Sequence, residues 1–396
     1  MYVSSWHHLP PYFFFSKNQK TLLRYYPFTH PRKHYFYYAR GGIYHVAKKL
    51  NQLGLKRVLF PAYHHGNEVK AMLAGGVGLT YYNIIDNGQI DFDDLERRIT
   101  ADTRVLYIIH YNGFAQNMER VMELVSTYNL YLIEDVALSM FSKYGDKYLG
   151  EFGDISIFCL YKTFAIPNGG LIVVNNPELD ITPQTRPPDR VSTISRLVGL
   201  FIYWMDNRFD GLGQKVQRVK TTVGEMFAKM NLEPTAVMDS VFDESKVNWG
   251  ISRLSKFLIN HSKVDDIIAL RRRNYQYYLD RLAADPMTID VLFPELNEGA
   301  VPFVMLAMVK NRDKIFERLL EKGIEASRFW RVWHPDVPKH EFPYVDRLRE
   351  EVLELPVHQS VTLKQIDMVV EHLRTIIQEV NPGIKARKST VFSRFG

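Results

Sequence analysis

From about residue 40 to residue 180, short apolar runs alternate with longer segments whose apolar residues recur every three or four positions. The short runs predict buried strands, and the longer segments predict amphipathic helices. The predicted strands are Arg57–Phe60, Leu79–Tyr82, Val105–Ile109, Leu130–Ile133, Ile155–Leu160 and Leu171–Val174. The predicted helices between them are Ile43–Leu53, Gly66–Ala74, Asp91–Ile99 and Met118–Tyr128. This alternation predicts an α/β layer built on a mainly parallel sheet.

The segments before and after this layer do not show its alternation of strands and helices. Residues 1–38 are aromatic and punctuated by proline, and they predict an arm that lies across other surfaces. Residues 180–246 begin with prolines and continue with helical sequence rich in Arg and Lys, which predicts a helical insertion. From Asn248 we expect one long helix that runs toward Tyr278 and crosses between domains.

The last hundred residues predict a small α+β domain. Phe303–Val309 is typical of a strand, and Asp313–Lys322 and Leu363–Ile377 are typical of helices. A chain of 396 residues exceeds one compact core, so two domains are the natural expectation. The expected divisions are an arm at 1–38, a large domain at 39–247, a connecting region at 248–300 and a small domain at 301–396.

Composition narrows the class of protein. A hydrophobic content of 46% with 24% charged residues is ordinary for a globular protein. The net charge of +6 is spread along the chain without a nucleic-acid-reading module, so we expect no nucleic-acid partner. The single cysteine, Cys159, excludes an intramolecular disulfide, and no secretory signal is evident, so we expect a cytoplasmic protein.

Asp135 and Lys162 carry the clearest chemical signal. Asp135 closes the apolar run Tyr131–Ile133, whereas Lys162 stands just past Ile155–Leu160 and is followed by the turn Gly169–Gly170. Such charges can simply be solvated, but buried strands seldom end in charge without a partner. Pyridoxal 5′-phosphate chemistry needs this pair, because a lysine holds the cofactor aldehyde as a Schiff base and a carboxylate keeps the pyridine nitrogen protonated.

Two glycines precede the first large helix of the predicted layer. Gly41 and Gly42 would let the backbone approach a phosphate closely at the positive end of a helix. The simpler alternative is that the pair only makes a turn. A cofactor with a phosphate at one end and a pyridine nitrogen at the other requires both kinds of site, so Lys162 adds weight to the phosphate hypothesis.

Two further loops follow predicted strands at the edge where open α/β sheets bind ligands. In the first, either Tyr63 or His65 has a ring suited to stacking on a flat cofactor. In the second, His110 or Asn112 has a side chain suited to contact with cofactor or substrate, and a polar turn is the alternative. Adjacent histidines without a partner at ligand spacing do not indicate a metal site, so we expect no metal.

These residues, in this order, resemble the DegT/DnrJ/EryC1/StrS family of fold-type I pyridoxal-phosphate enzymes, the sugar-aminotransferase-like proteins. The resemblance runs from about Arg40 to Asn176 and resumes near Asn248, leaving Asp180–Lys246 uncovered. The matching stretches are Pro61–His65, His110–Gly113, Glu134–Asp135, Gly150–Asp154, Lys162 with Gly169–Gly170, Gly323–Glu325 and Leu355–His358. The resemblance implies a seven-stranded, mainly parallel sheet between helices, with a small α+β C-terminal domain.

Residue by residue, the resemblance implies Lys162 as the Schiff-base lysine and proton shuttle and Asp135 as the partner of the pyridine nitrogen. It implies Gly41 and Gly42 as phosphate ligands and His65 as the stacking ring. Two positions depart from the family. Leu138 stands where Gln or His commonly bonds the ring oxygen of the cofactor, and Cys159 stands where a serine commonly holds the phosphate.

The resulting functional prediction is an aminotransferase that moves an amino group, with glutamate as the expected donor, to a keto sugar linked to a nucleotide. Lys162 argues against the sister dehydratases, which have histidine there. The family implies a homodimer, and the arm 1–38 is a candidate for subunit contact. Two alternatives stay open, a non-sugar substrate and a cofactor-poor binding or scaffold subunit. Leu197–Met205 is too short to span a bilayer, so it predicts a buried helix of the insertion, with an interfacial helix as the alternative.

Overall fold

The computed structural model describes residues 1–17, 21–209, 242–283, 289–331, 334–338 and 340–382. The large domain contains a seven-stranded sheet, and every strand predicted between residues 57 and 174 is part of it. In spatial order the strands are β1 (Lys33–Phe36), β11 (Gly170–Val174), β10 (Ile155–Cys159), β7 (Tyr131–Asp135), β6 (Val105–Ile109), β2 (Arg57–Pro61) and β3 (Gly78–Tyr82). β10, β7, β6, β2 and β3 are mutually parallel, whereas β11 runs antiparallel to both of its neighbours.

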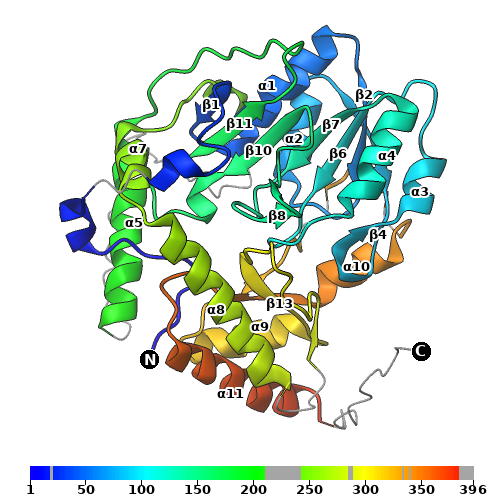
Figure 1. The fold of residues 1–396 in the computed structure, drawn as a ribbon. Coiled ribbons are helices and arrows are strands. Elements are labelled where there is room, and N and C mark those ends of the chain that lie inside the picture. Colours follow the sequence, from blue (N-terminus) through cyan, green and yellow to red (C-terminus); the bar gives the residue numbers. More distant parts are fainter. Residues whose placement is uncertain (18–20, 210–241, 284–288, 332–333, 339, 383–396) are drawn as a thin grey trace.

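Helices of the large domain follow the predicted order along the chain (Figure 1). They are α1 (Ala39–Gln52), α2 (Asn67–Ala74), α3 (Phe92–Arg97) and α4 (Met118–Tyr128). α3 and α4 begin at side-chain caps, because Asp91 and Asn117 each accept a hydrogen bond from a backbone N–H of the first turn. Two small antiparallel ribbons complete this domain, β4 (Ile84–Ile85) with β5 (Gln89–Ile90) and β8 (Lys143–Tyr144) with β9 (Lys147–Tyr148).

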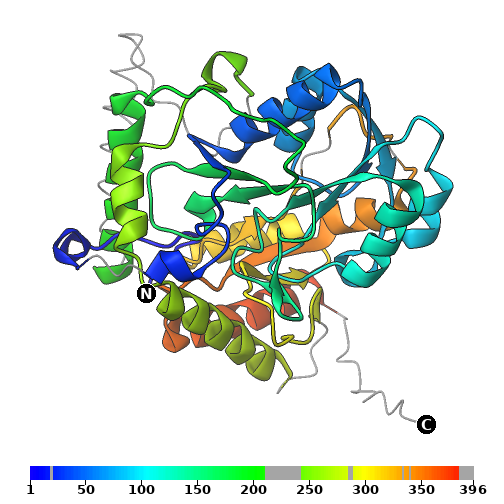
Figure 2. The ribbon, with the colours of Figure 1, turned by 45° about the horizontal axis from the view of Figure 1, so that its top comes forward.

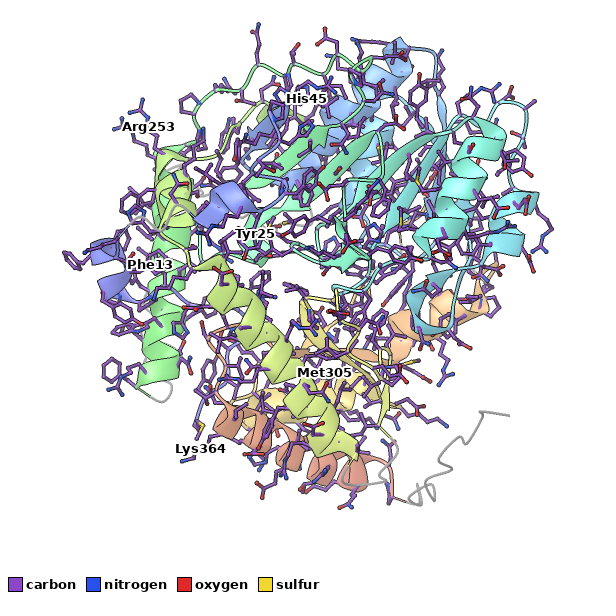
Figure 3. All side chains as sticks on the ribbon, viewed as in Figure 1. Phe13, Tyr25, His45, Arg253, Met305 and Lys364 are labelled. Carbon is purple, nitrogen blue, oxygen red and sulfur yellow. The ribbon has the colours of Figure 1, made fainter. Side chains whose placement is uncertain are left out.

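The small domain has a four-stranded antiparallel sheet covered by helices, which lie below the large sheet in Figure 1. Its strands are, in spatial order, β12 (Asp290–Val291), β13 (Val304–Met308), β15 (Val352–Pro356) and β14 (Ser327–Arg328). Its helices are α9 (Arg312–Glu321), α10 (Pro343–Glu351) and α11 (Leu363–Val380). Met305 of β13, labelled in Figure 3, is fully buried in this core. Of these elements, β13, α9 and α11 match the sequence prediction.

The predicted long helix after Asn248 is wrong in one respect, because the structure has two helices there. α7 (Arg253–Asn260) ends before α8 (Val264–Ala283) begins, and residues 261–263 separate them. The hydroxyl of Ser262 donates to the carbonyl of Leu258 at 2.9 Å, which closes α7 locally. The turn also allows Val264 to be fully buried at the start of α8.

The first 38 residues cross both domains. Ordered structure starts earlier than the sequence pattern indicated, since β1 pairs with β11 at the edge of the large sheet. Near the chain start, Val3 exchanges backbone hydrogen bonds with Gly323 and Glu325 of the small domain. Between these points the arm lies beside α5 (Arg190–Arg208) and α7, at one end of the molecule in Figures 1 and 2, and the ring of Phe14 stacks on Phe201 and Phe257.

The described part of the predicted insertion is largely helical. The carboxylate of Asp189 caps the N-terminus of α5, and the helix buries Leu200 and Ile202 while Val198 is exposed. The rest of this prediction, residues 210–241, lies outside the described residues. Among the described helices, none has the length and apolar character that a bilayer crossing requires.

Candidate active site

A cavity of about 320 Å³ opens where the carboxyl ends of β7 and β10 face the small domain. Its walls come from three parts of the chain. The large domain contributes Lys162, Asp135 and His65, the small domain contributes Glu354, and the arm contributes Trp6. The volume lies within the range of pockets that hold a small molecule.

The sheet brings Asp135 and Lys162 to one cavity. β7 and β10 are adjacent and parallel, so their carboxyl ends meet at the same edge. Asp135 is the last residue of β7, and Lys162 ends the single turn Leu160–Lys162 that follows β10. The next strand returns through Gly170, where a Cβ would collide with the backbone of Ala39 at the start of α1. The glycine-rich turn behind Lys162 therefore lets the chain pass close to the first helix.

Asp135 is a buried carboxylate with two protein donors. The hydroxyl of Tyr107 donates to it at 2.6 Å, and the backbone N–H of Ala137 donates to it at 2.9 Å. Burial, followed by the negative charge of Glu68, raises the pKa of Asp135 to about 6, although these two donors and Lys162 act in the opposite direction. A nearby cationic ligand would relieve this cost of ionisation.

Lys162 is held by contacts of its backbone and side chain. Its Nζ lies 5.9 Å from the centre of the Phe303 ring on the small-domain side. Its carbonyl oxygen accepts a hydrogen bond of 3.0 Å from the guanidinium of Arg271, which also donates to the carbonyls of Pro302 and Phe303. Arg271 thus fixes the lysine turn to the small domain.

His65 and Glu68 line the cavity at the start of α2. The Glu68 carboxylate accepts a hydrogen bond of 2.7 Å from the backbone N–H of His65, and burial raises the pKa of Glu68. Desolvation, with the positive charge of Lys162 next in size, lowers the pKa of His65 to about 4, so its ring is neutral near pH 7. Tyr63, the alternative stacking residue, is buried against Trp330 and Tyr111 and is not part of the cavity wall.

The two glycines of α1 face the sheet more than the cavity. A Cβ on Gly42 would lie 2.5 Å from Ile172, so close packing of the helix on β11 requires this glycine. The backbone N–H of Gly41 donates to the carbonyl of Tyr38 at 3.1 Å. The residues of this helix start that line the cavity are Tyr38, Ala39, Arg40 and Ile43. A phosphate hypothesis for Gly41 and Gly42 remains a proposal, and the structure adds the charge of Arg40 beside them.

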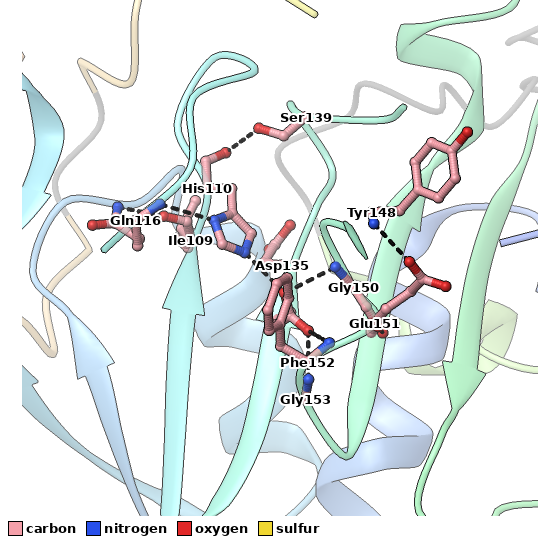
Figure 4. Close-up of polar contacts among 12 residues, drawn as sticks. Ile109, His110, Gln116, Asp135, Ser139, Tyr148, Gly150, Glu151, Phe152 and Gly153 are labelled. Atoms are coloured by element: carbon pink, nitrogen blue, oxygen red, sulfur yellow. Dashed lines mark hydrogen bonds and ion pairs between the residues drawn. The ribbon is translucent and has the colours of Figure 1, made fainter. Parts of the chain in front are cut away.

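His110 and Asn112 lie outside the cavity wall. His110 is fully buried, with Nε2 3.0 Å from Glu134 and Nδ1 accepting from the N–H of Gln116 at 3.2 Å (Figure 4). Asn112 exchanges two hydrogen bonds of 2.8 Å with the backbone of Val304 and thereby joins the large domain to β13. Both side chains are engaged in structural contacts outside the cavity wall, which does not favour the prediction that they contact cofactor or substrate.

The two departures from the family pattern do lie at the cavity. Leu138 and Cys159 both line it, and both are buried. Burial raises the pKa of the Cys159 thiol, which therefore remains protonated near neutral pH and is only a weak hydrogen-bond donor. Neither residue supplies the strong donor that the family commonly has there.

Sequence reasoning missed several cavity residues. Arg40 stands next to the glycine pair, and Glu68 lies one turn beyond His65, so both were within reach of the loops already singled out. Glu354 carried a recognisable signal, since it is one charged residue inside the otherwise apolar strand Val352–Pro356. Trp6 carried none, because only the path of the arm brings it to the cavity. Within the described residues, no cluster of His, Cys, Asp or Glu has the arrangement of a metal site.

Comparison with known proteins agrees with this architecture. The DegT/DnrJ/EryC1/StrS aminotransferase family profile matches residues 49–185 and 257–374. A UDP-4-amino-4,6-dideoxy-N-acetyl-beta-L-altrosamine transaminase from Campylobacter jejuni is 24% identical over 359 residues, which covers 84% of this chain and 82% of that protein. GDP-perosamine synthase from Escherichia coli O157:H7 is 40% identical, but over 93 residues, or 23% of this chain and 26% of that protein.

Solved structures extend the agreement in fold across nearly the whole chain. The aminotransferase PseC of Helicobacter pylori superimposes with a TM-score of 0.64 at 15% identity, covering 95% of this chain and 94% of that one. GDP-4-keto-6-deoxymannose-3-dehydratase (ColD) superimposes with a TM-score of 0.63 at 16% identity, covering 92% and 93%, so structural similarity alone does not separate the two reactions. The profile match spans more than half of the chain, and this protein belongs to the DegT/DnrJ/EryC1/StrS aminotransferase family.

Proposed function

We propose that the protein is a pyridoxal 5′-phosphate-dependent aminotransferase that moves an amino group from an amino acid, glutamate in the first instance, to a nucleotide-linked keto sugar. The observation that carries the proposal is one cavity faced by both Lys162 and the buried Asp135. An amine and a carboxylate that meet at the ends of adjacent parallel strands are the two groups that this cofactor requires.

The chemistry of the cavity fits that cofactor. Asp135 offers a buried carboxylate whose raised pKa calls for a cationic partner, which a protonated pyridine nitrogen provides. Arg40 and the start of α1 offer positive charge to a phosphate. The neutral ring of His65 offers a flat surface for stacking. When bound, the cofactor supplies a ring that withdraws electrons from the substrate carbon.

The side chains of the cavity then have distinct roles in the reaction. Lys162 takes a proton on its Nζ from the substrate carbon and returns it, acting as general base and then general acid. Asp135 keeps a negative charge in a buried position, where it acts most strongly. Trp6 and Trp330 line the cavity with apolar surface and exclude water from the reacting atoms.

Relatives support the choice of acceptor. The similar proteins include transaminases named for UDP-linked and dTDP-linked amino sugars. A non-sugar carbonyl compound is the alternative acceptor, because the insertion that begins after Asp180 is not covered by the family resemblance and would reshape the substrate side of the pocket. We further propose a homodimer in the cytoplasm, in which the arm lies near the second subunit while Val3 holds its start on the small domain.

One experiment separates this enzyme from a cofactor-poor binding subunit, an alternative that Leu138 and Cys159 motivate. The purified protein is loaded with pyridoxal phosphate, and its absorbance band is recorded before and after adding L-glutamate. We expect a band that glutamate bleaches, loss of the band in Lys162→Ala, and an unchanged band in Lys143→Ala. Lys143 is a suitable control because its ammonium lies over the Tyr148 ring, outside the cavity wall. A protein that shows no band after loading would contradict the proposal.

A further inference from the structure

Glu354 forms part of the small-domain wall of the cavity. It lies on β15 directly opposite Ser327 of β14, and both residues line the cavity. Its strand neighbours Leu353 and Leu355 are fully buried in the small-domain core. Because side chains alternate along a strand, Glu354 points the other way, into the cavity.

Glu354 differs from the other carboxylates of the cavity in having no donor. Asp135 accepts from Tyr107 and Ala137, and Glu68 accepts from the N–H of His65. No hydrogen bond or ion pair reaches the Glu354 carboxylate from the described part of the chain. Burial raises the pKa of Glu354 to about 7, and the opposing influence comes from the charge of Lys162. Glu354 is partly buried in the cavity wall, so its carboxylate is open to the cavity, and a ligand bound there is a natural source of its donor.

The charges around the cavity indicate which part of a ligand meets Glu354. Arg40 and Arg331 line the same cavity and suit anionic groups, such as phosphates or the carboxylates of an amino acid donor. Glu354 would repel those groups. A sugar ring offers neutral hydroxyl groups or an amino group, which donate hydrogen bonds to a carboxylate.

We propose that Glu354 recognises the sugar ring of the acceptor by accepting a hydrogen bond from a hydroxyl or amino group on that ring. This inference rests on the proposed function and makes it more specific. Glu354 is a specificity-determining residue in this role, because a site built to bond a substrate donor rejects an analogue that lacks it.

The test measures the two halves of the reaction separately in single turnover. The loaded protein is first bleached with L-glutamate, and colour is then restored with 4-keto-6-deoxyhexoses linked to UDP, GDP or dTDP. Wild type is compared with Glu354→Ala, Glu354→Gln and the control Glu350→Gln, whose side chain is exposed on α10. We expect Glu354→Ala to keep the glutamate half within about threefold and to lose about 10- to 100-fold in kcat/KM for the keto sugar.

The pattern across variants identifies the donor on the sugar. Glu354→Gln retains an acceptor oxygen, so it should lose less than Glu354→Ala if the partner is a hydroxyl and about as much if the partner is an ammonium. A deoxy counterpart of the accepted sugar should react with wild type as poorly as the parent sugar reacts with Glu354→Ala, and the two losses should not add.

Other outcomes overturn the inference. If the Glu354→Ala variant has the same kcat/KM for the keto sugar as wild type, Glu354 does not take part in recognition of the sugar. Equal losses of rate in the glutamate half-reaction and the keto-sugar half-reaction would instead indicate that Glu354 acts on Lys162 and does not recognise the sugar. If glutamate fails to bleach wild type, or if no keto sugar restores the colour, the proposed function itself fails, and this inference falls with it.

Discussion

Glu134 and Asp135 are consecutive acidic residues at the end of β7, and their carboxylates have opposite surroundings. Glu134 accepts hydrogen bonds from the backbone N–H groups of Gly150, Phe152 and Gly153 and lies against His110 (Figure 4). Asp135 has two donors and lines the cavity. A carboxylate saturated with donors fixes a loop, whereas one that faces a cavity remains available to a ligand.

The largest expected effect is on activity, from replacing the carboxylate that faces the cavity. Asp135→Asn removes the negative charge proposed to face the pyridine nitrogen but keeps the size of the side chain. We expect kcat/KM to fall by about 10²- to 10³-fold. Steady-state assays of the loaded enzyme measure this, with circular dichroism as a check on folding. Activity within about tenfold of wild type would contradict the functional role proposed for the Asp135 carboxylate.

Replacing the saturated carboxylate should act on stability instead. Glu134→Gln places an amide among three backbone N–H donors and a histidine, in a site without solvent exposure. We expect a loss of about 3–5 kcal/mol in the free energy of unfolding, measured by urea denaturation. The folded variant should retain its cavity chemistry at low temperature. A variant of wild-type stability and no activity would reverse the assignments of the two residues.

A pH series sharpens the comparison in the cofactor-free protein. Because the pKa of Asp135 is about 6 when folded and near 3.8 when unfolded, the native state binds the extra proton between these values. The contribution of Asp135 to stability is therefore lost as pH rises from about 4 to about 6. Relative to wild type, Asp135→Asn should gain roughly 2 kcal/mol between pH 4 and pH 7 in urea unfolding. A constant difference across this range would contradict the raised pKa.

The smallest effect concerns the apolar residue that follows this pair in the cavity wall. Leu138→Gln introduces a hydrogen-bonding group beside Asp135 without changing the sheet. We expect the dissociation constant of pyridoxal phosphate to decrease by about three- to tenfold, since one added hydrogen bond is worth about 1 kcal/mol. Absorbance titration measures it, with Leu149→Gln, buried elsewhere in the core, as a control that should only destabilise.

Much of this architecture could be read from local pattern. The apolar runs of β2, β6, β7 and β10 are long enough to identify buried strands, and the helices that separate β2, β6 and β7 along the chain predict the parallel order of these three. Lys162 and Asp135 stand out because charge at the end of a buried strand needs a partner. The apolar pattern after Asn248 did not reveal the break between α7 and α8. The hydrogen bond from the Ser262 hydroxyl to the Leu258 carbonyl closes α7 there, and hydrophobic periodicity does not report such a bond.

The sequence by itself determined strands β2, β3, β6, β7, β10 and β11 of the large sheet and helices α1 to α4, and it singled out the amine and the carboxylate as candidates, since these depend on residue spacing within short segments. Only the tertiary structure decided that Glu134 and His110 bind a loop while Asp135 faces a cavity, that Trp6 reaches that cavity and that Glu354 faces it without a donor. These outcomes depend on contacts between segments more than a hundred residues apart or on which face of a strand is covered, and no local spacing encodes them.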